Sequence, residues 1–283
     1  MELFVPLIYN DFSLNFTRGP MVSKIAFLYL ASMAWGCLVL LPVVKLKEVG
    51  QGFYRFFGFF CVILDTLAVG LALFSGPDFD AGFHRSSWAL GFSLLFTLCF
   101  TIALRVRVRW FLWACFALAA GSGGLAIGFY PWLGKDGFVF LLFHAFCSGL
   151  VLGFGILAMM LGHWYLVTPK LSISPLKRYS SGYILLTVLT ALELALTYFL
   201  FVGFGQTPAT FRGSHLLHEE GIFALFRVAW GILPPLGMSY WIWETVRMKS
   251  TQSATGILYA ALVCTLLGEG MGLYLTLATG VPF

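Results

Sequence analysis

Five ionisable residues lie in the interior of the long apolar stretches of this 283-residue sequence, away from the ends of those stretches, and they are its best candidates for chemistry. They are Asp65, His144, Glu193, Arg227 and Glu269. An ionisable group in the hydrocarbon of a bilayer costs several kcal/mol unless it is paired or hydrated, so each of them needs a partner. Carboxylates and imidazole accept and release protons, whereas a guanidinium keeps its charge. The residue types therefore indicate ion pairing and proton handling.

Arg227 and Glu269 are predicted to form an ion pair. They carry opposite charges and belong to consecutive apolar stretches that run in opposite directions. At 1.5 Å per helical residue, they lie roughly 10 Å and roughly 15 Å below the same membrane surface. The alternative is that Arg227 extends outward to water or towards Glu220. Seven residues along a straight helix are too many for a direct contact with Glu220, which favours the pair with Glu269.

His144 is expected at a depth similar to that of Arg227, with Asp65 and Glu193 near the middle of the membrane. The imidazole can join either carboxylate in a polar cluster, or it can make a simple hydrogen bond between helices. We assign Glu269, Arg227 and His144 as candidate catalytic residues. His144, Asp65 and Glu193 are the candidate cofactor-binding residues, with quinone as the possible cofactor.

The histidines permit one haem arrangement and no strong metal motif. Axial histidine ligation of haem is common, so His144 with His84 or His218 is a possible but disfavoured site for a single b-type haem. A four-histidine di-haem protein is excluded, because His144 and His163 are roughly 28 Å apart along a helix. The stretch 215–220 lacks the HExxH spacing of zinc proteases, and its acids suit the start of a helix. No metal site is predicted.

The composition defines the class of protein. Hydrophobic residues make up 60% of the chain and charged residues 10%, with a mean hydropathy of +0.91. Soluble domains carry about 25% charged residues, so this chain cannot cover a surface that faces water. Soluble enzymes, nucleic-acid-binding proteins and disordered regulators are therefore excluded, and the lipid bilayer is the main partner. The six cysteines lie inside apolar stretches without a CxxC motif, which disfavours a disulfide framework.

Eight apolar stretches are each long enough to cross the roughly 30 Å hydrocarbon core. Backbone groups in lipid must be satisfied within their own segment, so each stretch is predicted to be a helix. The sequence predicts one all-α membrane domain, 1–283, with residues 1–20 as an interfacial arm. The predicted transmembrane helices are 21–44, 53–74, 88–104, 110–130, 138–163, 183–205, 222–246 and 254–278. Pairs of small residues predict close helix approach at Gly124/Gly128, Gly149/Gly153 and Gly268/Gly272.

Basic residues are distributed unequally between the two sides of this bundle. The loops that follow the first, third, fifth and seventh apolar stretches (the odd loops) carry eleven Lys and Arg residues. The segments on the opposite side of the bundle carry five. Under the positive-inside rule the odd loops are cytoplasmic, so both chain ends face the outer, periplasmic or extracellular side. The sequence thus predicts a multi-pass protein of the plasma (inner) membrane.

This plan resembles that of the quinone-interacting membrane anchors of respiratory oxidoreductases, including the polysulfide-reductase type. The resemblance rests on helix count, outward chain ends and an outer polar cluster among aromatic residues, and it transfers no residue role. It implies an electron-transfer subunit that binds quinone or quinol near the outer face, handles its protons and needs redox partner subunits. Two other classes stay open. One is a proton- or ion-coupled transporter with a path through Asp65, Glu193 and Glu269. The other is a non-catalytic scaffold or assembly protein.

Overall fold

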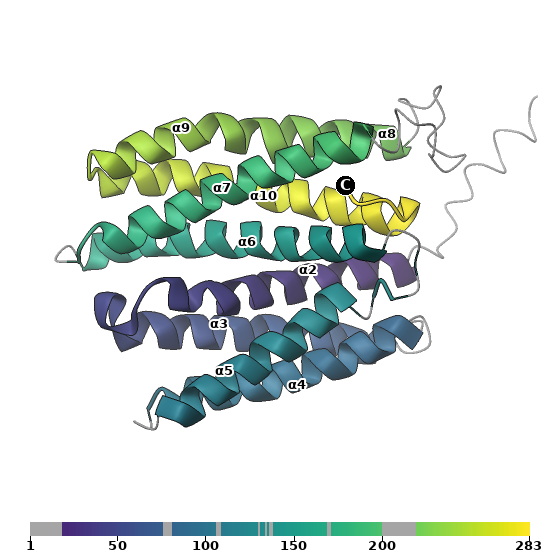
Figure 1. The fold of residues 1–283 in the computed structure, drawn as a ribbon, viewed down its shortest axis with the longest axis horizontal. Coiled ribbons are helices and arrows are strands. Elements are labelled where there is room, and N and C mark those ends of the chain that lie inside the picture. Colours follow the sequence, from purple (N-terminus) through teal and green to yellow (C-terminus); the bar gives the residue numbers. More distant parts are fainter. Residues whose placement is uncertain are drawn as a thin grey trace, which may run out of the picture.

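The protein is an all-helical bundle in every part of the chain that the structure describes. The computed structural model contains eight helical spans that are long and apolar enough to cross a membrane, which confirms the predicted multi-pass architecture (Figure 1). The predicted arm, apart from its last two residues, and the stretch 215–218 lie outside the described residues. The structure describes residues 19–75, 81–105, 109–129, 131–133, 135, 138–168, 171–199 and 219–283.

Each predicted span corresponds to one helical span of the structure, and two of the spans contain a π-helical segment. The segment η4 (Leu125–Phe129) continues α5, and η7 (Arg227–Ile232) joins α8 to α9. The part of the predicted sixth span from residue 200 to 205 lies outside the described residues. The helices are α2 (Gly19–Leu40), α3 (Leu46–Ser75), α4 (Ala81–Ala103), α5 (Arg109–Gly124), α6 (Phe138–Val167), α7 (Ser174–Thr197), α8 (Glu219–Phe226), α9 (Leu233–Arg247) and α10 (Thr251–Thr279).

Three helices begin well before the apolar stretches that predicted them. Helix α3 starts at Leu46 rather than 53, α4 at Ala81 rather than 88, and α7 at Ser174 rather than 183. Their first turns carry polar and charged side chains, so a hydropathy pattern detects only the portion in the hydrocarbon core. In α3 the chain turns sharply at Gly50, whose φ of 84° favours glycine.

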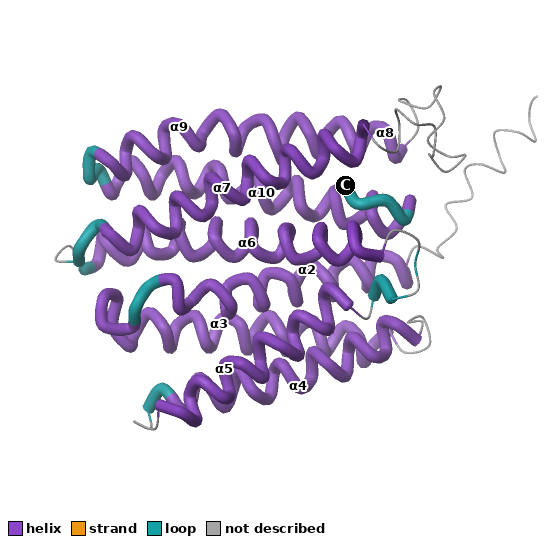
Figure 2. Tube along the Cα trace, viewed as in Figure 1, coloured by secondary structure: helices purple, strands orange, loops and turns teal. Residues whose placement is uncertain are grey.

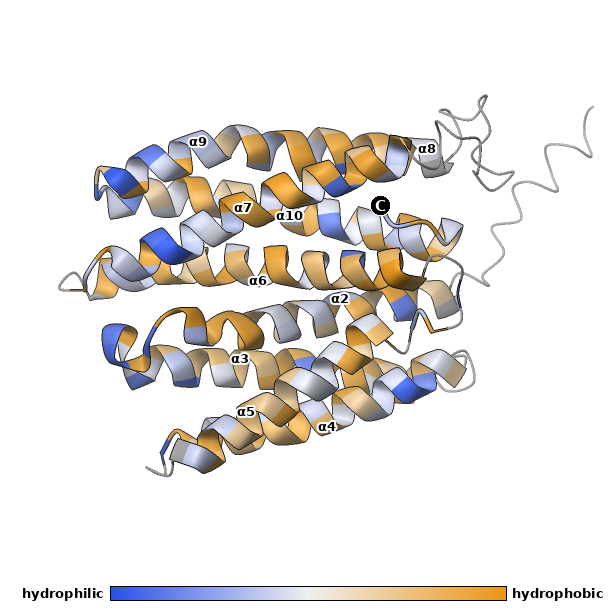
Figure 3. Ribbon diagram, in the orientation of Figure 1, coloured by the Kyte–Doolittle hydropathy of each residue, from blue (hydrophilic) through white to orange (hydrophobic). Residues whose placement is uncertain are grey.

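The helices lie side by side in an elongated bundle, with the start of α2 and the end of α10 at the same end (Figure 1). Helices α2 to α5 form one half and α6 to α10 the other, with α2 packed on α6 between them. The described connections are short and lie at the two ends of the bundle (Figure 2). Apolar colours run along the whole bundle, and hydrophilic colours gather at the α7 and α9 ends opposite the C-terminus (Figure 3).

The two halves meet where helix backbones touch. A Cβ atom at Gly36 of α2 would lie 1.8 Å from the carbonyl oxygen of Gly149 on α6. A Cβ atom at Gly153 would lie 2.3 Å from the carbonyl carbon of Gly36. The predicted close approach at Gly149/Gly153 is therefore confirmed. Backbones touch again where α10 meets η7, because a Cβ atom at Gly268 would lie 2.2 Å from the Cα atom of Gly231.

The predicted pair Gly124/Gly128 leaves space for aromatic rings. A Cβ atom at Gly128 would lie 2.7 Å from the ring of Phe146, and one at Gly124 would lie 3.4 Å from the indole nitrogen of Trp35. Small residues therefore have two different effects in this bundle. In α6 and α10 they allow helix backbones to touch, and in α5 and η4 they leave space for aromatic side chains of neighbouring helices.

The backbone contact at Gly36 predicts that Gly36→Ala destabilises the protein. The added methyl group overpacks the contact between α2 and α6, which typically costs about 1–3 kcal/mol. Gly70→Ala in α3 is the matched control, because a Cβ atom there meets nothing within 4 Å. We expect thermal unfolding of the detergent-solubilised protein to shift downward for Gly36→Ala and to stay unchanged or rise for Gly70→Ala. Equal melting temperatures for the two variants would contradict the close approach.

Candidate functional site

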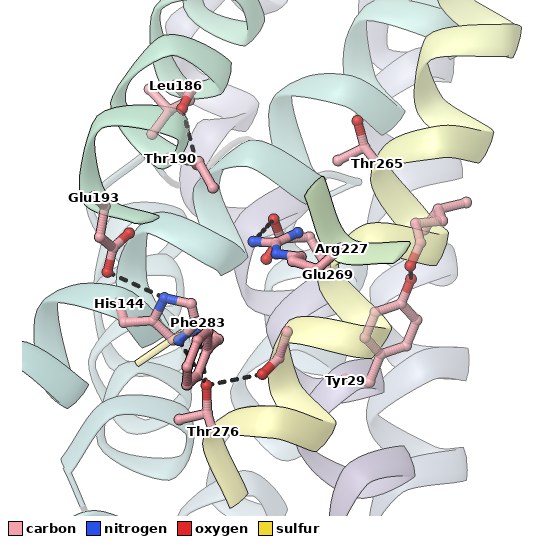
Figure 4. Close-up of polar contacts among 12 residues, drawn as sticks. Tyr29, His144, Leu186, Thr190, Glu193, Arg227, Thr265, Glu269, Thr276 and Phe283 are labelled. Atoms are coloured by element: carbon pink, nitrogen blue, oxygen red, sulfur yellow. Dashed lines mark hydrogen bonds and ion pairs between the residues drawn. The ribbon is translucent and has the colours of Figure 1, made fainter. Parts of the chain in front are cut away.

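The predicted pair of Arg227 and Glu269 is present in the interior of the bundle. Nη2 of Arg227 lies 2.8 Å from Oε1 of Glu269, and the two side chains are 1% and 3% exposed (Figure 4). The three guanidinium nitrogens make no hydrogen bond of regular geometry within the described part of the chain. The contact is therefore chiefly one of opposite charges. It neutralises two groups that neither lipid nor apolar side chains could solvate.

The π-helical segment that begins at Arg227 has a local cause in the sequence. Pro234 and Pro235 carry no N–H, so they cannot bond to the carbonyls of Trp230 and Gly231 as an α-helix requires. The N–H of Leu233 instead reaches back five residues to the carbonyl of Val228. Such π-bulges are frequent at functional sites, because they change the direction in which side chains project.

Glycines make the space in which the guanidinium lies. Cβ atoms at Gly268 and Gly272 of α10 would lie 3.0 Å and 2.9 Å from Nη1 and Nε of Arg227. A Cβ atom at Gly231 would lie 3.3 Å from Nη1. Any larger residue at Gly272 would displace either the arginine or the carbonyl of Phe283, which lies 2.4 Å from the same Cβ position.

A second buried acid–base pair joins α6 to α7. Nδ1 of His144 lies 3.1 Å from Oε1 of Glu193, and their side chains are 6% and 9% exposed (Figure 4). The other ring nitrogen lies 3.5 Å from Oγ1 of Thr276 on α10. That hydroxyl donates its hydrogen to the carbonyl of Gly272, so towards His144 it can only accept. Both ring nitrogens thus face oxygen atoms that can accept a hydrogen bond.

The structure decides which carboxylate accompanies His144. It is Glu193, whereas Asp65 lies on α3 in the other half of the bundle and has no hydrogen bond or ion pair to any described residue. Asp65 is nevertheless only 2% exposed. The predicted cluster therefore forms without Asp65. A buried carboxylate without a partner is very costly, so Asp65 is a group that either binds a proton or meets a further partner.

A stripe of buried polar side chains continues from Glu193 along α7. The spacing of three or four residues places them on one helix face, and four of them are at most 4% exposed. The hydroxyl of Tyr183 lies 2.7 Å from that of Thr265 on α10, and the ring of Tyr183 contacts Gly155 of α6. The α7 stripe consists of Glu193, Thr190, Thr187, Tyr183 and Ser180.

The α7 stripe ends beside polar groups at the far end of the bundle. The hydroxyl of Tyr179 donates to the carbonyls of Leu40 and Leu41, both at 3.2 Å. One residue earlier, Nη2 of Arg178 donates to Oε2 of Glu48 at 2.6 Å, and these side chains are 35% and 29% exposed. Buried polar groups and half-exposed ions thus follow one another from the His144 region to this end.

The α7 stripe and the partners Thr276 and Thr265 are not among the residues predicted from the sequence. The signal was present, because the polar residues of α7 recur at helical spacing. It was overlooked because hydroxyl groups hardly lower the mean hydropathy of a span. In this structure most of them bond to a carbonyl four residues back in their own helix, as Thr187 and Thr190 do.

A small cavity adjoins His144, and its size bears on cofactors. Its volume is about 10 Å³, and Tyr29, Ser32, His144 and Ser148 are among its lining residues. This space suits a single water molecule with several polar neighbours. It does not fit a haem or the ring of a quinone.

No protein-family model matches this chain, and no match was found among curated protein sequences or solved structures. The functional interpretation therefore depends on the chemistry and geometry of the site alone.

The ion pair predicts strong coupling between Arg227 and Glu269 in stability. Glu269→Gln or Arg227→Met alone leaves a buried charge without its partner, which typically costs about 3–5 kcal/mol. We expect thermal stability or folded yield to fall in each single variant and to recover partly in the double variant.

Arg247 and Glu244 provide the matched control for this cycle. Their contact is 3.7 Å and their side chains are 69% and 33% exposed, so removing either should cost less than about 1 kcal/mol. Additive effects of the two single substitutions at Arg227 and Glu269 would show that the pair does not couple.

Proposed function

We propose that this multi-pass protein conducts protons through its α6–α10 half, as a proton- or ion-coupled transporter. The observation that supports this most directly is the α7 stripe, which extends along the helix from the His144–Glu193 pair towards the Arg178–Glu48 pair. Glu193 and Tyr179 are separated by 14 residues, or roughly 21 Å of helix. That is most of the roughly 30 Å hydrocarbon core.

The residues along this route have the chemistry that a proton relay needs. Glu193 and His144 exchange protons, and hydroxyl groups such as those of Tyr183 and Ser180 both donate and accept hydrogen bonds. Neighbours on one helix face are about 5–6 Å apart at their Cβ atoms, a gap that a water molecule can bridge. Oε2 of Glu193 and Oγ of Ser180 have no hydrogen-bond partner among the described residues, so both are open to such a bridge.

The stripe favours this class over the two others that the sequence leaves open. A quinol-binding subunit needs an apolar slot of ring size next to its proton acceptor, and the cavity beside His144 has about 10 Å³. A scaffold protein needs buried polar pairs for specific helix packing. It does not need a continuous line of buried polar side chains across most of the membrane. Redox partner subunits are not required by a proton path.

The orientation of the path follows from the positive-inside rule. The end with Arg178 and Glu48 also carries Lys45, Lys47 and Arg247, so we place it in the cytoplasm. The His144–Glu193 pair then lies towards the outer face of the plasma membrane, together with both described chain ends.

Proton movement can be measured in proteoliposomes that contain a pH-sensitive dye, with a potassium diffusion potential as the driving force. We expect the wild-type protein to acidify the lumen faster than empty vesicles do. Glu193→Gln and Tyr183→Phe should abolish the difference, because each removes an exchanging group from the route. Glu244→Gln, a half-buried carboxylate outside the route, should conduct like the wild type. Wild-type vesicles that behave like empty ones would refute the proton path.

The proposed orientation predicts which cysteines a membrane-impermeant reagent can label in intact cells. In a background without the six native cysteines, Ser75→Cys at the end of α3 should be labelled from outside. Ser250→Cys between α9 and α10 should be labelled only after the cells are opened. The reverse pattern would place the Arg178–Glu48 pair on the outer side.

A further inference from the structure

A groove of about 500 Å³ runs between α4 and α5, away from the α7 stripe. Arg85, Trp88, Phe92 and Phe96 line its α4 side at spacings of three or four residues, which places them on one helix face. Gly121 lies in its α5 side, where a Cβ atom would meet nothing within 4 Å. The groove is therefore apolar, open to the lipid phase and widened by the missing side chain.

Charge and length together indicate what the groove can hold. Arg85 is exposed at one end, and its Nε donates to the carbonyl of Ala81 in its own helix. From Arg85 to Phe96 the helix advances 11 residues, or roughly 16 Å. One leaflet contributes about half of the 30 Å core, so the groove extends through a single leaflet from a cation at its surface.

We infer that the α4–α5 groove is a binding site for an anionic phospholipid. One acyl chain lies along Trp88, Phe92 and Phe96, and the phosphate group contacts the guanidinium of Arg85. The chain fills apolar space of matching length, and the anionic headgroup finds opposite charge at the membrane surface. A zwitterionic lipid would cover the same apolar walls, but its own cation would oppose Arg85.

The inference can be tested on the full chain purified in mild detergent from membranes of known lipid composition. Lipids that remain bound after washing are extracted and quantified by mass spectrometry. We expect anionic phospholipid to be retained in a fixed ratio to protein and to be enriched over its proportion in the membrane. Arg85→Gln should lose this enrichment, and Arg85→Lys should keep most of it. Gly121→Leu should reduce the total amount of lipid retained.

Two control variants distinguish lipid bound in the groove from lipid bound elsewhere on the surface of the bundle. Lys135→Gln removes another exposed charge from the same end of the bundle, and Gly256→Leu adds a side chain to an exposed, open position of α10. Both should retain lipid like the wild type, and melting curves should show that all variants are folded. The inference would be overturned if the retained lipids had the same composition as the bulk membrane, or if the variants and the controls lost equal amounts of lipid. An isoprenoid quinone as the retained molecule would also overturn it.

Discussion

The contact between Arg227 and Glu269 places opposite charges where the surroundings can stabilise neither one alone. Much of the α6–α10 half is arranged around this constraint. Glycines at 231, 268 and 272 give the guanidinium room, and two prolines cause the π-helical segment from which Arg227 projects. Because Glu269 and Thr276 occupy one face of α10, the same helix supports both the ion pair and the imidazole of His144. A single helix thus takes part in both buried contacts, through Glu269 towards Arg227 and through Thr276 towards His144.

In the proton path that we propose, the two buried pairs have different physical roles. The Arg227–Glu269 contact holds a guanidinium, which only donates hydrogen bonds, against a carboxylate inside the bundle. In the path that we propose, a proton passes between His144 and Glu193 through their 3.1 Å contact. The hydroxyl groups along α7 carry no charge, whether they donate or accept a hydrogen bond. They are therefore suited to the middle of the membrane, where a charge costs most.

The sequence predicts those features that depend on depth and sign of charge. Eight spans, the Arg227–Glu269 pair and two of the three glycine contacts follow from hydropathy, helical rise and small-residue spacing. The partner of His144 stayed open between Asp65 and Glu193, because depth does not reveal which way a helix is rotated about its axis. The early starts of α3, α4 and α7 were missed because polar turns in the headgroup zone resemble loops in composition. The π-segment at Arg227 depends on backbone hydrogen bonding, which no periodicity displays.

The position of α10 in the chain has a consequence for how the protein is made. Arg227, His144 and Tyr29 all belong to segments that are synthesised earlier, yet each contacts a residue of α10. During insertion an arginine therefore enters the bilayer before its carboxylate partner exists. It must wait near the headgroups, or in contact with the insertion machinery, until α10 follows. Helix α10 thus supplies the carboxylate on which the burial of Arg227 depends, and a chain shortened before α10 would leave this cation without its partner.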